Sequence, residues 1–168
     1  MSRYPNRTVV LLRTMPLFAE CTHQQLELLG KVADEVQLPA GCVLTQQGER
    51  ITRDCFVIVT GLVEVTRDGQ RTGVAGPGEL VGEMSLLDGR PRRAGLRTIT
   101  PTRLLSFDYR GFAQLRSCPS VARKMNELYL IRSGQHNVDE LGCADDDGPQ
   151  LPSRQGLLHL RRRQGQLA

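Results

Sequence analysis

The chain has no tryptophan, and aromatic residues of all kinds make up only 4% of its 168 residues. Its core must therefore consist mainly of Val, Leu and Ile side chains. No apolar run reaches the length that a membrane span needs. Near the N-terminus, Arg13 interrupts the apolar residues before they reach signal-peptide length. These absences predict a soluble, cytoplasmic protein.

Patterns typical of metal sites and of catalysis are also missing. The five cysteines are dispersed with no C-x-x-C pair, which argues against structural zinc and iron–sulfur clusters; they are Cys21, Cys42, Cys55, Cys118 and Cys143. Their odd number and the predicted compartment favour reduced thiols. The three histidines suggest no metal triad, and neither a Ser/Cys–His pair nor a nucleoside-triphosphate loop is visible. We therefore expect no metal, no cofactor and no enzymatic activity.

The length fits one domain with tails, and we place that domain at residues 1–141, with its core at about 10–138. A formal net charge of +4 permits an anionic ligand or nucleic acid but requires neither. Residues 142–168 hold an acidic stretch, Asp145–Asp147, and a basic cluster, Arg161–Arg163. A flexible, solvated tail is the simplest interpretation, and a segment that docks on nucleic acid, a membrane surface or a partner is the alternative.

The first part of the chain predicts helices followed by strands. A short helix over Thr8–Leu12 should end before Pro16. Thr22 and Gln25 have capping-box spacing at the start of an amphipathic helix over 23–34. Short β-branched runs separated by turn residues then predict about eight strands. One turn, Asp68–Gly69, is a strong hairpin signal. Strands this short at this spacing favour an antiparallel sandwich or roll.

The helical pattern returns after residue 107. Asp108 should cap a short helix over Tyr109–Arg116. A longer helix should begin at Pro119, with an apolar stripe that includes Leu128 and with an i,i+4 ion pair between Arg123 and Glu127. The predicted fold is mainly β: an antiparallel, jelly-roll-like β-roll with N-terminal helices and two C-terminal helices.

Residues 82–94, between two strand-like segments, carry the clearest functional signal. Glycines allow close approach of a ligand, Glu83 could accept a hydrogen bond from a ribose hydroxyl, and Arg92 could bind a phosphate. These residue types suit a sugar phosphate. The alternative is an ordinary surface loop, in which Arg92 and Arg93 are solvated and Glu83 caps a helix.

The chain resembles the cyclic nucleotide-binding domain family, which includes catabolite-activator-type regulators, protein kinase A regulatory subunits and cyclic nucleotide-gated channels. The resemblance covers about residues 10–138. It rests on two ordered patterns in this sequence: Pro39-x-Gly41 … Gly48-Glu49 … Phe56-x-Ile58-x-x-Gly61-x-Val63-x-Val65, and the phosphate-binding cassette Gly78-Glu79-x-x-Gly82-Glu83-x-Ser85-Leu86-Leu87 … Pro91-Arg92-x-Ala94.

The resemblance implies a ligand site made of Gly82, Glu83, Met84, Ser85, Arg92, Arg93 and Ala94. In it, Glu83 would accept from the ribose 2′-hydroxyl, and Arg92 would neutralise the cyclic phosphate. Met84 and Ser85 would occupy the first turn of a short cassette helix, and Arg93 and Ala94 would add backbone N–H donors. In this family a C-terminal helix covers the base, and Tyr129 and Arg132 are the candidates here because either can stack on a purine.

One position departs from the family pattern. Gly95 stands where Thr or Ser is common, and the missing hydroxyl favours cAMP over cGMP. We expect a sensor that binds a cyclic nucleotide, moves its C-terminal helices and signals to an unknown effector protein, or acts through a homodimer formed by the C-terminal helix. No winged helix for DNA binding is visible. Two alternatives stay open: a degenerate module used for ligand-independent interaction or dimerisation, and an adaptor that uses Arg161–Arg163.

Overall fold

The computed structural model describes residues 6–50 and 54–134. Residues up to Leu130 belong to one compact unit, and a second unit begins at Ile131 in the last turn of the final helix. The elements at the N-terminus are α1 (Arg7–Thr14), the 3-10 helix η1 (Pro16–Phe18) and α2 (His23–Val32). Those that follow the strands are α4 (Tyr109–Ser117) and α5 (Pro119–Gly134).

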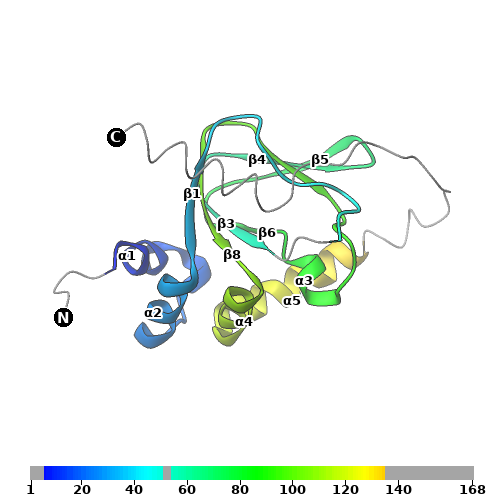
Figure 1. Cartoon of the computed structure of the whole chain (residues 1–168). Coiled ribbons are helices and arrows are strands. Elements are labelled where there is room, and N and C mark those ends of the chain that lie inside the picture. Colours follow the sequence, from blue (N-terminus) through cyan, green and yellow to red (C-terminus); the bar gives the residue numbers. More distant parts are fainter. Residues whose placement is uncertain (1–5, 51–53, 135–168) are drawn as a thin grey trace. The chain divides into compact units, whose positions relative to one another are not determined.

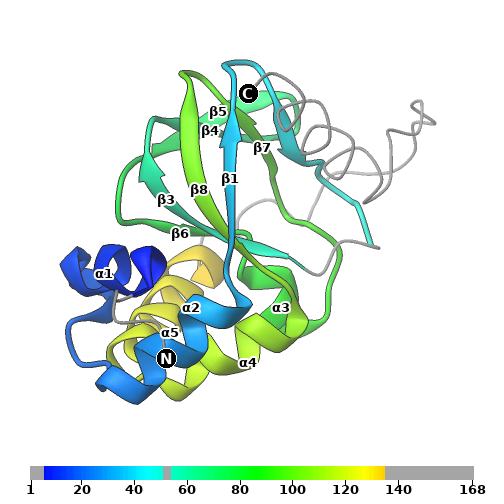
Figure 2. The same cartoon turned by 60° about the vertical axis from the view of Figure 1, so that its left-hand side comes forward.

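In the described part of the chain, eight strands form two four-stranded sheets in which all neighbours are antiparallel (Figures 1 and 2). The first has the order β1-β8-β3-β6 and the second the order β2-β7-β4-β5. The strands are β1 (Asp34–Leu38), β2 (Val43–Thr45), β3 (Cys55–Thr60), β4 (Val63–Arg67), β5 (Gln70–Ala75), β6 (Leu80–Val81), β7 (Gly95–Thr98) and β8 (Thr102–Phe107). The predicted antiparallel roll with flanking helices is confirmed.

Strand β3 explains how the two layers are held together. Its residues from Cys55 to Val59 are all buried, because the strand has apolar neighbours on both faces. Phe56 and Ile58 point into the core between the two sheets. Cys55, Val57 and Val59 alternate with them and pack in a second core against the helices. A continuous apolar run in the sequence therefore becomes a strand buried on both sides.

The helices α1, α2 and α4 gather at one end of the roll, as both views show (Figures 1 and 2). Their buried side chains share one cluster with the outer face of the β3 sheet and with the start of α5. Its largest members outside the strands include Leu12, Phe18, Leu29, Phe112, Leu115 and Met125. Burying these apolar surfaces is the main force that holds the helices on the sheet.

The caps and the hairpin turn that the sequence predicts are present in the structure. Thr22 and Gln25 form the predicted capping box at the start of α2. Asp108 accepts a hydrogen bond from the Gly111 N–H and so caps α4. Asp68 and Gly69 both have positive φ, 50° and 74°, as the predicted hairpin turn requires.

Two expectations from the sequence are wrong. Arg123 does not pair with Glu127; it forms an ion pair with Glu20, and Glu127 pairs with Lys124 instead. The long-range partner lies in another element, which helical spacing alone cannot reveal. The expectation that all thiols are reduced also fails for Cys21 and Cys118, which form a disulfide.

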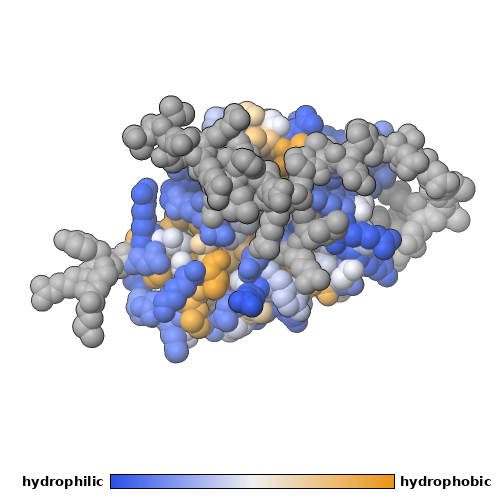
Figure 3. Space-filling view, in the orientation of Figure 1, coloured by the Kyte–Doolittle hydropathy of each residue, from blue (hydrophilic) through white to orange (hydrophobic). Residues whose placement is uncertain are grey.

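The predicted tail 142–168, with its basic cluster Arg161–Arg163, lies outside the described residues, as does the predicted domain boundary at residue 141. On the face seen in Figure 3, the coloured residues are mostly hydrophilic, and hydrophobic side chains form small groups among them. Within residues 6–50 and 54–134, no helix is both long enough and apolar enough to cross a bilayer.

We predict that Gly61→Ala will destabilise the protein far more than Gly69→Ala. Both glycines have positive φ, so an L-residue costs about 1–2 kcal/mol at either position. At Gly61 a Cβ would also lie 2.5 Å from the Pro101 carbonyl oxygen, whereas nothing lies within 4 Å at Gly69. The collision should add about 1–3 kcal/mol to the loss of unfolding free energy. Urea denaturation measures both variants, and equal losses would contradict the close packing at Gly61.

Candidate functional site

The segment singled out in the sequence connects the two sheets. It leaves β6, passes Gly82 and Glu83, forms the short helix α3 (Met84–Asp88) and returns to β7. Gly82 has φ of 80°, and a Cβ there would lie 3.1 Å from Arg92 Nη1. A glycine is therefore required both by the backbone conformation and by the close approach of an arginine.

Arg92 joins the two ends of this segment. Only 3% of the residue is exposed. Its Nη1 donates to the Gly82 carbonyl oxygen and its Nη2 to the Asp54 carbonyl oxygen, each at 2.5 Å. Its backbone N–H donates to the Glu49 carbonyl, and its own carbonyl accepts from the Gly48 N–H. The side chain of this one buried residue thus connects the cassette with the start of β3, and its backbone connects them with the turn at residues 48–49.

Burial shifts the pKa values of Arg92 and of its neighbour Cys55. Desolvation lowers the pKa of Arg92, and the neighbouring Cys55, Asp54, Glu49 and Glu83 act in the opposite direction. An arginine starts so far above neutral pH that it stays protonated. Burial also raises the pKa of the Cys55 thiol far above its ordinary value, and the charge of Glu83 adds to this shift. Cys55 is therefore a neutral, unreactive thiol under the cassette.

The surface-loop interpretation of the segment is wrong. Glu83 is fully buried and occupies the N-cap position of α3, but its side chain makes no capping hydrogen bond. Arg92 is buried as described, and the side chain of Arg93 is only 7% exposed. An ordinary loop would leave these three charged side chains in solvent, because burying them carries a desolvation cost.

Arg93 faces a different set of neighbours from Arg92. Its guanidinium forms an ion pair with the carboxylate of Asp88 at the end of α3. It also lies over the ring of Tyr129 on α5, with 6.0 Å between the guanidinium carbon and the ring centroid. Tyr129, a candidate for covering a base, is thus in contact with the cassette. Arg132, the other candidate, lies half-buried in the last turn of α5.

The remaining predicted residues lie in the same segment. Met84 and Ser85 form the first turn of α3, as expected, and the Ser85 hydroxyl is buried without a hydrogen-bond partner. The Ala94 carbonyl accepts from Thr45 Oγ1. Gly95 begins β7 opposite Thr66, whose Oγ1 would lie 2.7 Å from an added Cβ. Strand packing is therefore a sufficient reason for a glycine at this position.

Sequence reasoning missed three residues that shape the site. Glu49 and Asp54 supply the carbonyl oxygens that hold Arg92, and Asp88 holds Arg93. Carbonyl contacts leave no side-chain signature in a sequence. Asp88 lies five residues before Arg93 within residues 82–94, and its opposite charge is the signal that could have identified it. In the described ranges, no group of three or more His, Cys, Asp or Glu side chains is arranged to hold a metal ion.

Known proteins match this chain in sequence and in fold. The sequence profile of the cyclic nucleotide-binding domain matches residues 35–117. The chain is 32% identical over 125 residues to a cyclic nucleotide-gated potassium channel of Mesorhizobium japonicum, a match that covers 74% of this chain and 34% of the channel. It is 31% identical over 136 residues to the cyclic AMP receptor protein of Thermus thermophilus, covering 76% of this chain and 62% of that protein.

The crystal structure of the Thermus thermophilus catabolite activator protein superimposes with a TM-score of 0.61 at 28% identity, covering 74% of this chain and 61% of that one. The chain spans about a third of the length of the channel and less than two thirds of the receptor protein. The profile match begins in β1 and ends in α4, so it contains the whole roll and the cassette. With its roll, cassette and flanking helices, this chain belongs to the cyclic nucleotide-binding domain family.

Proposed function

We propose that this protein is a sensor that binds a cyclic nucleotide, with cAMP preferred over cGMP, and that it performs no catalysis itself. The observation that carries the proposal is the burial of Arg92 against Gly82, next to a fully buried Glu83. A cation and a carboxylate are held at opposite ends of one short segment. The two groups match the phosphate and the ribose of one ligand.

In this proposal each polar group of the site binds one part of the nucleotide. Arg92 donates to the cyclic phosphate, which is a stronger acceptor than the neutral carbonyls that it contacts here. Glu83 accepts from the ribose 2′-hydroxyl. The buried hydroxyl of Ser85 would gain a partner in the ligand. The N–H groups of Met84, Arg93 and Ala94 supply further donors, and Gly82 leaves room for the ribose.

The hydroxyl groups near the cassette support a preference for cAMP. Gly95 offers no hydroxyl to a guanine. The threonine hydroxyls next to this segment donate to the chain itself: Thr45 to the Ala94 carbonyl and Thr66 to the Gly95 carbonyl. The relative from Thermus thermophilus is called a cyclic AMP receptor protein.

The signal would leave the site through α5. Tyr129 covers the base from this helix, with Arg132 as the alternative, and the nucleotide stabilises the conformer in which cassette and helix close together. The moving helices would act on an effector protein or on a second copy of the chain. The relatives show how varied such outputs are, since their names describe potassium channels and transcriptional regulators.

The degenerate, ligand-independent module is the competing function. Its support in the sequence is Gly95, for which the close approach of Thr66 Oγ1 is a sufficient structural reason. Failure of both cAMP and cGMP to bind in a calorimetric titration would favour this competitor.

The first prediction for this site concerns Arg92. Arg92→Ala should weaken cAMP binding by about 10-fold to 150-fold, because charged hydrogen bonds contribute about 1.5–3 kcal/mol. Arg92→Lys keeps the charge but loses the paired donors, and should also weaken binding. Arg90→Ala is the matched control, since Arg90 is exposed in the same loop. Calorimetry gives the affinities, and thermal unfolding shows whether each variant is folded. Unchanged affinity in a folded Arg92→Ala protein would contradict the phosphate assignment.

The second prediction concerns Glu83. The wild-type protein should bind 2′-deoxy-cAMP about tenfold more weakly than cAMP, because the analogue removes a hydrogen bond to a buried carboxylate. In Glu83→Gln this difference should shrink, since the neutral amide accepts a weaker hydrogen bond. Both ligands are titrated into both proteins. If the penalty for the deoxy analogue is the same in the two proteins, Glu83 does not read the ribose.

A further inference from the structure

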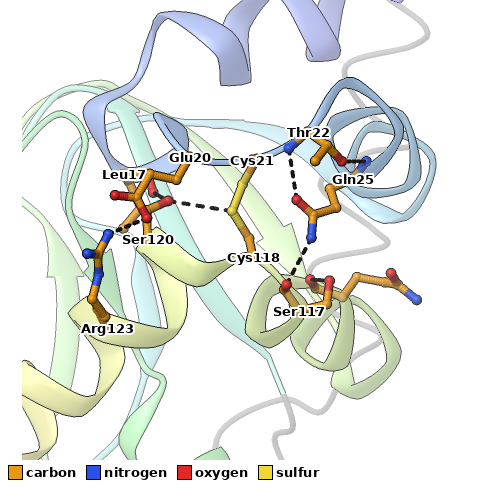
Figure 4. Close-up of a disulfide and its surroundings, with 10 residues drawn as sticks. Leu17, Glu20, Cys21, Thr22, Gln25, Ser117, Cys118, Ser120 and Arg123 are labelled. Carbon is orange, nitrogen blue, oxygen red and sulfur yellow. Dashed lines mark hydrogen bonds and ion pairs between the residues drawn. A yellow bond between two sulfur atoms is a disulfide. The ribbon is translucent and has the colours of Figure 1, made fainter.

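The disulfide between Cys21 and Cys118 joins two helix junctions that are far apart in the sequence (Figure 4). Cys21 lies between η1 and α2, and Cys118 lies between α4 and α5. Their Cα atoms are 5.3 Å apart, and 97 positions separate them in the chain. The bond therefore connects the N-terminal helices with the point at which α5 begins.

Cys118 is the hinge residue of the two C-terminal helices. Its N–H donates to the Leu115 carbonyl and closes α4, where it is the C-cap. Its carbonyl accepts from the Ala122 N–H, which is the first hydrogen bond of α5. Any rotation of α5 relative to α4 must change the backbone at this residue. A covalent bond on its side chain restricts that rotation.

The other polar contacts at this junction are non-covalent. Gln25 Nε2 donates to the Ser117 carbonyl at 2.9 Å, and Ser120 Oγ donates to the Leu17 carbonyl at 2.8 Å. Glu20 and Arg123 form an ion pair between side chains that are 49% and 68% exposed, and such a pair stabilises little. Figure 4 shows these contacts around the disulfide. Without the disulfide, the junction would keep only bonds that can open and close.

The surroundings accommodate the reduced pair as well. Cys118 is fully buried in the helical core, and its Sγ lies 3.5 Å from Ser120 Oγ. As a thiol it could donate to that oxygen while Ser120 continues to donate to Leu17, so the buried thiol would have a partner. Cys21 is only half-buried, so an attacking thiolate can reach its sulfur. The site thus fits a disulfide and a dithiol.

The helix that begins at this junction also reaches the cassette. Tyr129 of α5 contacts Arg93, which is paired with Asp88 of α3. We propose that the Cys21–Cys118 pair is a redox-responsive tether that sets the freedom of α5. In the oxidised form the start of α5 is held on the N-terminal helices, and in the reduced form it can move.

The chemistry is thiol–disulfide exchange. A thiolate of a small dithiol attacks the Sγ of Cys21, and the bond to Cys118 breaks and leaves the Cys118 thiolate, which takes up a proton. The second thiolate of the reagent then attacks the reagent's own sulfur in the mixed disulfide, and the bond to Cys21 breaks and leaves the Cys21 thiolate, which is also protonated. The protein gains two electrons and two protons and the reagent becomes a cyclic disulfide. In a compartment that keeps thiols reduced, oxidation of this pair would be the signal.

A consequence for ligand binding rests on the function proposed above. The tether holds α5 in the arrangement that places Tyr129 on the cassette. We therefore expect the oxidised protein to bind cAMP at least about fivefold more tightly than the reduced protein, a typical size for coupling between two sites.

Hydrogen exchange of the full chain tests the tether without any nucleotide. Exchange of the amides in residues 120–130 should be about tenfold faster after reduction by a small dithiol, whereas exchange in β3 and β8 should be unchanged. Cys21→Ser should show the fast exchange with and without the dithiol. Cys42→Ser is the matched control and should respond as the wild type does, since Cys42 is a free thiol outside the pair.

Three outcomes overturn the tether. Equal exchange of α5 in the two redox states shows that the bond restricts nothing. Loss of protection throughout the chain on reduction shows that the bond only stabilises the fold. A response to reduction that persists in Cys21→Ser assigns it to other thiols.

Titration of both redox forms with cAMP separates the tether from the proposed sensor function. If α5 responds to reduction but no cyclic nucleotide binds, the tether is supported and the sensor function is contradicted. If cAMP binds equally to both forms, the sensor function is supported and the coupling between redox state and binding is contradicted.

Discussion

The structure around the cassette depends on one constraint: the guanidinium of Arg92 is buried and must be satisfied by the protein. A buried charge without partners would cost several kcal/mol, so its acceptors have to be fixed in place. Those acceptors are the carbonyl oxygens of Gly82 and Asp54. The requirement explains why Gly82 adopts positive φ beside the guanidinium and why β3, β6 and the cassette keep a fixed geometry.

The adjacent residues Arg92 and Arg93 contact different parts of the structure. Arg92 contacts the carbonyl oxygen of Gly82 at the start of the cassette. Arg93 contacts Asp88 of α3 and Tyr129 of α5. In the proposed sensor, the group that binds the phosphate and the group that contacts the covering helix are therefore one peptide bond apart. A shift of the backbone at Arg92 must also move Arg93. This short covalent connection is a physical route from ligand to helix, and the route needs no long network of side chains.

The sequence predicted what depends on local chemistry. The roll, the capping box at Thr22 and the hairpin at Asp68–Gly69 follow from periodicity, caps and turn residues, and the position of the cassette helix follows from the family resemblance. It could not predict contacts between elements that are distant in the chain. The ion pair of Arg123 with Glu20, the disulfide and the carbonyls around Arg92 all depend on tertiary packing. The buried state of Arg93 belongs to the same class, because its charge suggests solvent and its contacts with Asp88 and Tyr129 depend on tertiary packing.

The disulfide lies at the opposite end of α5 from the residue that contacts the cassette. Between them the helix buries Val121 and Met125 in the core, so its middle is held by apolar packing while its two ends are held by specific contacts. Apolar packing has no directional requirement, and it tolerates small rotations of a helix better than hydrogen bonds do. The contacts at its two ends should therefore determine the orientation of α5. In the two proposals, one end would respond to the charge on the cassette and the other to the redox state of Cys118, so one helix would combine two unrelated signals.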